Sequence, residues 1–441
     1  MREMKDSGID WIGAIPTTWE VYKHKHFLLD MYSGGTPTSS NPSFYDNEKG
    51  TPFVSIADMS KCQYVYKTKV GVSYAGIADK NLIIQPCGTI LYSIYATVGA
   101  VAELKIDATI SQAILSLKQK DTICEKRFYK YNLIAMKDYV FFETNGNTQF
   151  NLNAEKVRNF YFVIPPLTEQ HCIADFLDQQ CKKIDEIIVD IQSQIDTLED
   201  YKKSVISEVV TKGLDPDTTM KDSGVSHIDS IPFHWKTLKL KYASTLKGRI
   251  GWQGLRTEEY RDEGPYLVTG TDFNKGYINW SSCVHISKER FEQDKNIQIQ
   301  ENDLLITKDG TIGKIAMAKE CPAEVSLNSG VFIVRNNRKY RYIDKFFYYI
   351  ILSKQFSLWF ELAQHGNSTI KHLTQENFYE FTFAYPPIAE QAQIVDFLDD
   401  KCAKLDSIIE DKKAQLETIE NYKKSLIYEY VTGKKEVPEN E

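Results

Sequence analysis

Residues 165–213 read PPLTEQHCIADFLDQQCKKIDEIIVDIQSQIDTLEDYKKSVISEVVTKG, and residues 386–434 read PPIAEQAQIVDFLDDKCAKLDSIIEDKKAQLETIENYKKSLIYEYVTGK. The two stretches align without a gap, and 26 of their 49 positions are identical. In each stretch apolar residues recur at alternating spacings of four and three, which is the pattern of a long helix that packs along one seam. We therefore expect two matching helices, each with the other as its partner.

Each seam contains mostly branched apolar residues and continues for more than four heptads. A helix of about 43 residues is roughly 64 Å long at 1.5 Å per residue, so the helices could act as a coiled-coil spacer. Lys202 and Lys423 occupy matching seam positions, where a polar residue can fix register and orientation. The predicted seam residues are Leu177, Ile184, Ile188, Ile191, Ile195 and Leu198 in the first helix, and Leu398, Leu405, Ile409, Leu416, Ile419 and Leu426 in the second.

A second repeat precedes each body of the chain. The segment Met4–Trp19 recurs as Met220–Trp235 with nine of sixteen positions identical. The chain therefore consists of two units, each with a lead-in, a body and a closing helix. If a pseudo-two-fold axis relates the units, the helices run antiparallel with one body at each end. We expect domains at residues 1–164, 165–213, 214–385 and 386–434, followed by a tail at 435–441.

The two bodies barely resemble each other in sequence, yet both are predicted to be rich in β-structure. Short apolar runs with aromatic and β-branched residues are separated by turn signals, and one segment of each body has a helical pattern. We expect two mixed α/β (α+β) modules that each recognise something different. The predicted strands are Pro52–Ile56, Thr89–Ile94, Ala113–Leu117, Leu304–Thr307 and Gly330–Val334, and the predicted helices are Lys126–Lys137 and Tyr342–Glu361.

Composition indicates a globular protein that is neither exported nor inserted in a membrane. Of the 441 residues 42% are hydrophobic, and no segment approaches the roughly 18 apolar residues of a membrane span. The N-terminus lacks the apolar run of a signal peptide. No two of the eight cysteines form a CxxC pair, which argues against a zinc ribbon and favours reduced thiols in the cytoplasm.

The net charge of −7 argues at first against a nucleic-acid partner, but its distribution changes that argument. The two helical stretches contain most of the excess acid, and the rest of the chain is close to neutral. Within that rest, residues 236–257 contain six basic residues and no acidic one. Such a segment is typical of DNA contact, since Arg and Lys reach guanine or phosphate and Gln pairs with adenine. The alternative is a solvated strand edge protected by lysines.

The residues predicted to contact DNA combine this basic segment with polar loops of both bodies. Within the segment they are Lys236, Lys239, Lys241, Lys247, Arg249, Gln253 and Arg256. In the loops they are Ser33, Thr36, Asn147, Gln149, Lys308, Thr311, Asn367 and Lys371.

The motifs that would indicate catalysis are missing from the sequence. Asn41–Phe44 loosely resembles an adenine-methyltransferase tetrapeptide but lacks its second proline and any glycine-rich cofactor loop upstream, so a turn is the better interpretation. Gly310–Lys314 lacks the Ser or Thr that completes a P-loop, and the histidines form no HExxH pattern. We therefore expect no catalytic residue, no metal site and no cofactor in this chain.

The arrangement of lead-in, body and PPxxEQ helix, repeated twice, resembles the specificity subunits of Type I restriction–modification enzymes over nearly the whole chain. Further points of resemblance are the lead-in endings Ile15–Trp19 and Ile231–Trp235 and the phrase Asp303–Gly313. The first body departs from the pattern. It has Cys87–Leu91 and Ala96–Ala100 where the second body has one intact Asp-Gly-Thr-Ile-Gly.

The resemblance implies a non-catalytic subunit whose two bodies are target recognition domains, each reading half of a bipartite, asymmetric site in double-stranded DNA. The helices would be spacers that also dock two methyltransferase subunits. Those partners would bind S-adenosylmethionine and methylate adenine, and separate restriction subunits would use ATP and Mg²⁺. Two other functions stay open: a two-module adaptor that binds proteins or glycans, and a fragment of a fused methyltransferase–specificity enzyme.

Overall fold

The computed structural model describes residues 2–60, 62–137, 139–140, 152–249, 255, 257–337, 340–363 and 372–438. The chain forms two compact units. Unit 1 consists of Met1–Ile191 and Ala414–Glu441, and unit 2 of Gln192–Lys413. Each unit is therefore assembled from one module, one half of the first long helix and one half of the second.

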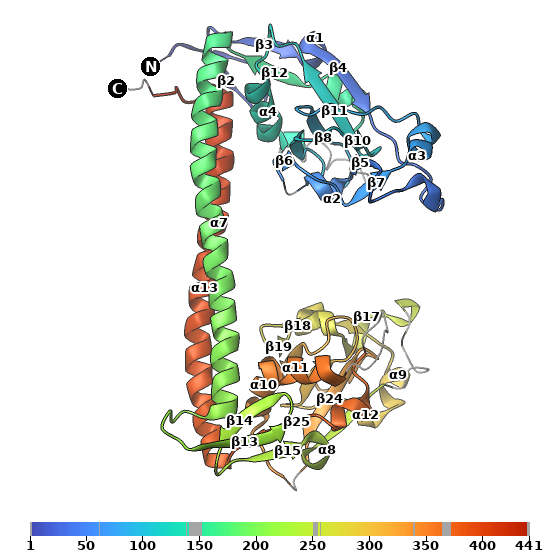
Figure 1. Ribbon diagram of the computed structural model, residues 1–441, viewed down its shortest axis with the longest axis vertical. Helices are drawn as coiled ribbons and strands as arrows, with labels where there is room; N and C mark the ends of the chain where they lie inside the picture. The colour runs from blue at the N-terminus through green and yellow to red at the C-terminus, as the bar shows by residue number, and fades with distance from the viewer. Residues whose placement is uncertain are drawn as a thin grey trace. The chain divides into compact units, whose positions relative to one another are not determined.

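The long helices are α7, Leu167–Lys212, and α13, Ile388–Val431 (Figure 1). Both begin directly after a pair of prolines, because proline fixes the backbone but cannot donate within a helix. All twelve predicted seam residues are at least partly removed from solvent. The buried ones are Leu177, Ile184, Ile191, Ile195, Leu398, Leu405, Ile409 and Leu426, and the half-buried ones are Ile188, Leu198, Leu416 and Ile419.

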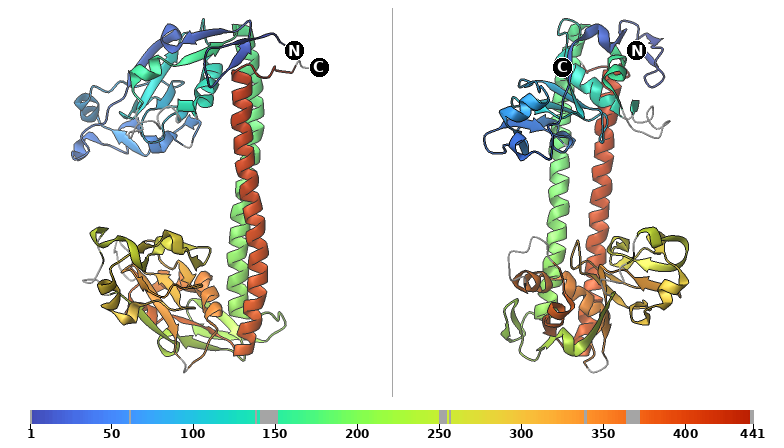
Figure 2. Two further views of the ribbon diagram at one scale, coloured as in Figure 1. Left: turned by 180° about the vertical axis from the view of Figure 1, so that it is seen from behind. Right: turned by 90° about the vertical axis from the view of Figure 1, so that its right-hand side faces the viewer.

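Within each unit the two helix halves run antiparallel. In unit 1 the rings of Phe176 and Tyr430 lie 4.6 Å apart, and further along α7 Asp185 pairs with Lys423, which is earlier in α13. In unit 2 the ammonium of Lys202 lies 2.6 Å from the carboxylate of Asp406. The start of α7 accordingly lies beside the end of α13 in unit 1, as the views of Figure 2 show.

The module of unit 1 is built around a five-stranded sheet of order β4-β11-β8-β9-β6 and a three-stranded sheet of order β10-β5-β7 (Figure 1). Its strands are β1 Met4–Asp6, β2 Ala14–Pro16, β3 Glu20–Lys23, β4 Leu28–Ser33, β5 Thr51–Val54, β6 Tyr64–Val65, β7 Val70–Val72, β8 Ile90–Ser93, β9 Val101–Leu104, β10 Thr109–Ile110, β11 Ile114–Gln119 and β12 Tyr161–Ile164. Its short helices are α1 His24–Phe27, α2 Ile56–Met59, α3 Tyr74–Asp79, α4 Lys126–Ala135 and α6 Ala154–Arg158.

The module of unit 2 has a six-stranded sheet of order β16-β24-β21-β22-β19-β18 and a three-stranded sheet of order β20-β17-β23. Its strands are β13 Met220–Val225, β14 Ile228–Pro232, β15 Lys236–Lys239, β16 Ser244–Gly248, β17 Arg261–Val268, β18 Phe273–Asn274, β19 Tyr277–Ile278, β20 Val284–His285, β21 Leu304–Thr307, β22 Ile315–Met317, β23 Val325–Leu327, β24 Val331–Asn336 and β25 Thr382–Tyr385. Its short helices are α8 Leu240–Ala243, α9 Lys288–Glu292, α10 Asp344–Leu352, α11 Lys354–Ala363 and α12 Gln375–Tyr379.

The two modules have the same strand order, apart from the additional β18 in unit 2. The prediction of two mixed α/β modules in a repeated frame with long antiparallel helices is therefore confirmed, and each predicted strand is found. One predicted helix was wrong in detail. The segment Tyr342–Glu361 forms two helices, because Ser353 has extended backbone angles (φ −82°, ψ 166°) between α10 and α11.

The same turn follows the central strand of each main sheet. In unit 1 the Ser93 hydroxyl donates to Thr97 O and accepts from Ala100 N (2.9 Å). In unit 2 the Thr307 hydroxyl donates to Thr311 O and accepts from Lys314 N (3.0 Å). Residues 96–100 of the first module therefore correspond to residues 310–314 of the second, which resolves the ambiguity left by the sequence.

Residues of the repeated stretches hold each module to its helices. The Trp19 indole donates to Glu169 (3.1 Å), as the Trp235 indole does to Glu390 (2.8 Å). The Gln170 side chain accepts from Glu125 N, just before α4, and the matching glutamine of α13 accepts from Ile343 N before α10.

The hydrophobic core of each unit passes from the sheet into the helix pair. In unit 1 the buried Phe128 and Phe162 belong to the same cluster as Leu177 and Leu426, and unit 2 has a corresponding cluster around Phe347 and Leu398. All eight cysteines are free thiols, as the sequence predicts. None of the helices in the described ranges combines the length and apolar character needed to cross a bilayer.

Candidate nucleic-acid interface

Three loops of unit 1 come together at one end of the main sheet. Gly35 N donates to Ile110 O (3.1 Å), and Ile94 N donates to Ala113 O (2.9 Å). These bonds bring together residues 33–36, 94–98 and 111–113, which we call the loop cluster of unit 1. Gly34 is required there, because a Cβ at this position would lie 2.2 Å from a backbone oxygen. Tyr95, Gln112 and the predicted DNA contact Ser33 are exposed on the cluster, and Thr36 is half-buried.

Two of the corresponding loops of unit 2 meet in the same way, and residues 372–373 join them. Lys308 N donates to Gly330 O (2.9 Å), and Leu373 N donates to Lys308 O (3.0 Å). The loop cluster of unit 2 therefore consists of residues 308–312, 328–330 and 372–373. The structure places the predicted residues Lys308 and Thr311 together here, with Thr311 exposed and the Lys308 ammonium 4.9 Å from the centre of the Phe332 ring.

The loop clusters present different side chains from matched backbone positions. Tyr95 in unit 1 corresponds to Asp309 in unit 2, since both precede the residue with positive φ in the shared turn. Gln112 corresponds to Ser329, because each follows a residue whose N–H donates to the end of the neighbouring parallel strand. In unit 1 Ser111 N donates to Val54 O, and in unit 2 Asn328 N donates to Val268 O. Tyr95 and Gln112 were not among the predicted contacts, because the two body sequences do not align well enough to show the correspondence.

The basic segment of residues 236–249 is divided between the two ends of strand β16. Lys239 and Lys241 lie before the strand and both donate to the carboxylate of Glu380, at 2.7 and 2.6 Å. These two lysines hold the pKa of Glu380 down at about 2. Lys236 is exposed on β15 at the same end, away from the loop cluster, whereas Lys247 is exposed close to it.

The structure contradicts the prediction that Arg249 contacts DNA. Its side chain is 2% exposed, with Nε donating to Leu327 O (3.1 Å) and Nη2 donating to Ser326 Oγ (3.0 Å). Burial lowers the pKa of this guanidinium. Arg249 therefore fastens the end of β23 beneath the loop cluster and does not lie on the surface. Six other predicted contacts lie outside the described residues: Asn147, Gln149, Gln253, Arg256, Asn367 and Lys371.

A second repeated surface lies on the long helices, beside the seam. Ile187 and Ile408 occupy matching positions and are 47% and 44% exposed, and Tyr201 and Tyr422 are likewise 49% and 57% exposed. The Asp185–Lys423 pair puts Ile187 level with Tyr422 in unit 1, and the Lys202–Asp406 pair puts Tyr201 level with Ile408 in unit 2. Each helix pair thus carries one exposed isoleucine and one exposed tyrosine at the same level. The sequence could have indicated these residues, because the same residue type occurs at matching positions of both helices outside the seam.

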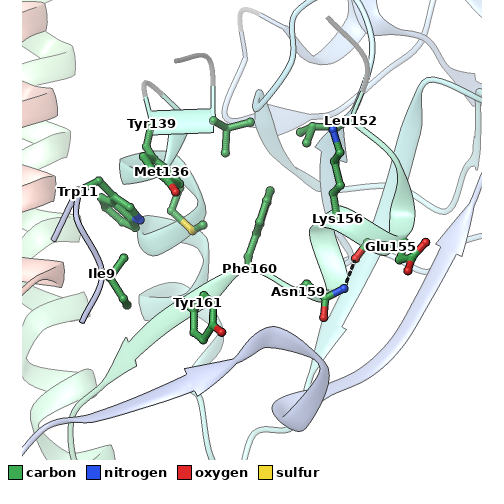
Figure 3. A pocket seen from close by; sticks show the side chains of 11 residues that line it. Ile9, Trp11, Met136, Tyr139, Leu152, Glu155, Lys156, Asn159, Phe160 and Tyr161 are labelled. Atoms are coloured by element: carbon green, nitrogen blue, oxygen red, sulfur yellow. Dashed lines mark hydrogen bonds between the residues drawn. The ribbon is translucent and has the colours of Figure 1, made fainter. Parts of the chain in front are cut away.

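A cavity of about 390 Å³ in unit 1 lies among the lead-in, the segment after α4, α6 and β12, and none of its lining residues belongs to the loop cluster (Figure 3). Trp11 and Tyr139 stack on one side, with ring centroids 5.3 Å apart, and Phe160 lines the floor. In unit 2 the rings of His227 and Trp359 both pack on Phe381, which corresponds to Phe160. Unit 2 also has a cavity at the corresponding place, lined by Val225, His227, Glu380 and Thr382 among others, so the cavity belongs to the shared frame of the modules.

The two segments that were compared with catalytic motifs, Asn41–Phe44 and Gly310–Lys314, form turns, as predicted. Residues 42–44 are a single 3-10 turn in which the Asn41 side chain accepts from Ser43 N (3.2 Å). Gly310 and Gly313 have positive φ values of 69° and 82° in the turn after β21.

The family pattern described as "Type I restriction modification DNA specificity domain" matches residues 16–197 and 249–418. The chain belongs to this family. The match covers most of both modules and most of both long helices, including the two repeated PPxxEQ phrases. The expected resemblance is thereby confirmed.

Relatives with this specificity domain match over most of their length. The EcoBI specificity subunit of Escherichia coli is 22% identical, with 92% of this chain and 84% of the relative covered. A putative MjaX specificity subunit of Methanocaldococcus jannaschii is 26% identical, with 96% and 95% covered. A solved chain from work on complex assembly and conformational transition of the type I R-M system has a TM-score of 0.65 at 14% identity, over 95% of this chain and 98% of that chain. At this identity the structural likeness shows the fold.

Proposed function

We propose that this chain is the DNA-reading subunit of a Type I restriction–modification complex, and that each module reads one half of a bipartite site in double-stranded DNA. The observation that supports this most strongly is the pair of loop clusters, in which matched backbones carry different side chains. A protein that reads an asymmetric site needs this combination, because the docking geometry is shared while the base contacts differ.

We assign no catalytic step to this chain. S-adenosylmethionine would bind to methyltransferase subunits, and ATP and Mg²⁺ to restriction subunits, so that the chain supplies recognition and assembly. The sequence supports this division because it carries neither a glycine-rich cofactor loop nor a phosphate-binding motif.

The two methyltransferase subunits would dock on the long helices. Support comes from the exposed Ile187 with Tyr422 in unit 1 and the exposed Ile408 with Tyr201 in unit 2. The same pair of side chains is available twice, which suits two copies of one partner, and apolar and aromatic anchors commonly dominate such interfaces.

The DNA-reading role is tested by selecting duplexes from a randomised pool with the chain assembled with its methyltransferase subunits. We expect a bipartite site whose binding weakens steeply with salt, because phosphate contacts release counterions. Exchanging residues 20–164 for another reader should change one half-site only. An adaptor would select no DNA sequence and show no such salt dependence.

The docking role is tested by the number of methyltransferase subunits bound in native mass spectrometry. We expect Tyr422→Glu to remove one of the two subunits, and Tyr422→Glu with Tyr201→Glu to remove both. The neighbouring exposed residue Asn421 supplies the control, and Asn421→Glu should retain both subunits. Full assembly of the double variant would rule out these helix surfaces as the docking sites.

A further inference from the structure

The exposed polar groups of the two loop clusters differ in the chemistry that they offer to a base. Gln112 in unit 1 carries a neutral amide, with one acceptor and two donor hydrogens. Asp309 in unit 2 carries a carboxylate, which only accepts when ionised. Both side chains are exposed, and each projects from a loop whose backbone is fixed by hydrogen bonds to the neighbouring strand.

Hydrogen bonds to neighbouring loops fix the backbone from which the Gln112 side chain projects. Ser111 N donates to Val54 O (3.0 Å), and Gln112 N lies 3.5 Å from the Thr36 hydroxyl. Ala113 O accepts from Ile94 N (2.9 Å), beside the exposed ring of Tyr95. The exposed Gln112 side chain thus projects from the meeting point of the three loops. Adenine presents the N7 acceptor and the N6 donor that such an amide pairs with in the major groove.

Asp309 is held in a comparable way in unit 2. Its carboxylate Oδ1 lies 2.6 Å from His372 Nδ1, and the turn that carries it is closed by the hydroxyl of Thr307. A carboxylate cannot hold a phosphate, since both are anionic. On a surface that lies against DNA, its second oxygen can accept from a donor on a base edge, and the N4 amino group of cytosine is the usual partner of Asp and Glu.

We propose that Gln112 selects an adenine in the half-site read by unit 1, and that Asp309 selects a cytosine in the half-site read by unit 2. This assignment rests on the proposed DNA-reading function and adds to it the residue and the base at one position of each half-site. His372 acts as a positioning residue, because it holds one carboxylate oxygen and leaves the other available to the base.

The test compares the sites selected from a randomised duplex pool by the full chain and its variants, each assembled with the methyltransferase subunits. We expect Gln112→Ala to lower the discrimination for adenine at one position of the first half-site by about ten- to a hundredfold, with the second half-site unchanged. Asp309→Ala should do the same for one cytosine of the second half-site. The matched controls are Lys118→Ala and Asp229→Ala, because these exposed residues lie on strands away from the loop clusters.

The outcomes separate this assignment from the function on which it rests. If the unmodified complex selects no bipartite site, the proposed DNA-reading function fails and the assignment with it. If a bipartite site is selected and Gln112→Ala and Asp309→Ala leave every base preference as it was, the assignment alone is overturned. Equal weakening for all sequences would also overturn it, because this would show that the side chains hold the DNA backbone.

Discussion

At the scale of single residues, the basic side chains of one short segment have three different surroundings. Lys239 and Lys241 are paired with one carboxylate, Lys247 is exposed near the loop cluster, and Arg249 is buried. Composition predicts that such a segment attracts DNA, but it does not show which side chains the fold uses internally. Tertiary contacts decide this. They place Arg249, which was predicted to contact DNA, in the interior of unit 2.

We predict that Arg249→Ala destabilises unit 2 and leaves base preference intact. The substitution removes two hydrogen bonds from a charged donor and leaves Leu327 O and Ser326 Oγ without it, so the expected loss is about 2–3 kcal/mol. Urea unfolding, followed by hydrogen exchange of β23 and β24, measures the loss. Lys247→Ala, an exposed neighbour, should change stability by less than about 0.5 kcal/mol. A stable Arg249→Ala protein with an altered target site would contradict this role.

Stability of unit 1 should fall in mild acid because of His24. This imidazole is fully buried, with Nδ1 2.8 Å from Val157 O and Nε2 2.7 Å from the Tyr129 hydroxyl. Burial lowers its pKa from 6.5 to about 4. The unfolded chain therefore binds a proton first as the pH falls below 6.5, and folding loses about 2 kcal/mol between pH 7 and pH 5.

The internal repeat supplies the control for this pH effect, because Leu240 occupies the position of His24 in unit 2. Both backbone N–H groups donate at 2.8 Å, His24 to Phe160 O and Leu240 to Phe381 O. We expect His24→Leu to remove the extra pH dependence, although the variant is less stable at pH 7 because the Tyr129 hydroxyl loses its partner. Hydrogen exchange of β3 and β12 at pH 7 and pH 5 reports the result. An unchanged pH dependence in His24→Leu would assign the effect to other groups.

At the scale of elements, the sequence predicts well what local periodicity determines. The seams of α7 and α13 are visible because each buried position recurs every three or four residues, and β21 is visible as an uninterrupted apolar run, Leu304–Thr307. The break at Ser353 is not visible, because apolar residues on both sides continue the helical pattern. The matched turns were also hidden, since Thr307 and Ser93 make the same hydrogen bonds within unlike sequences.

The loop clusters could be predicted only in part for a related reason. Lys308 and Thr311 were found because polar residues follow a strand, but Gln112 lies between two buried strands and gives no such signal. Its place beside Tyr95 depends on pairing between distant strands. Sequence patterns do not specify that pairing without a reference fold.

The ion pairs of the two seam lysines provide a prediction at this scale. Lys202→Asp would place a like charge beside Asp406, and Lys202→Asp with Asp406→Lys would restore an opposite pair. We expect the single variant to destabilise unit 2 and the second change to recover about 0.2–1 kcal/mol, the usual coupling of partly exposed ion pairs. A double-mutant cycle from urea unfolding measures the coupling. Lys203→Asp is the control, because Lys203 is exposed and lies beside Lys202. Equal losses of stability in Lys202→Asp and Lys203→Asp would show that the Lys202–Asp406 pair does not fix the register of the helices.

At the scale of the whole molecule, the continuity of α7 and α13 through both units gives the spacer hypothesis a direct test. Duplicating residues 185–191 and residues 417–423 inserts one heptad in each helix and keeps an aspartate facing a lysine at both levels, because the helices are antiparallel. Each insertion adds about 10 Å at 1.5 Å per residue. At about 3.4 Å per base pair, we expect the undefined gap of the DNA target to widen by about three base pairs.

The half-site sequences should stay the same in the lengthened protein, since no module residue changes. Methylation mapping with the partner subunits reads both the gap and the half-sites. Duplication in α7 alone is the control, and it should prevent assembly because the seam loses its register. A lengthened protein that assembles and keeps the original gap would show that the helices do not set the spacing.

Under the proposed DNA-reading function, the matched turns predict that the two half-sites are bound with unequal entropic cost. Ala96 and Gly310 occupy the same position with φ values of 58° and 69°, but the alanine has far fewer backbone conformations available to it than the glycine. Restricting the glycine turn against a rigid duplex therefore loses more conformational freedom than restricting the alanine turn. Under the proposed function, binding of unit 2 to its half-site should therefore weaken sooner on warming than binding of unit 1.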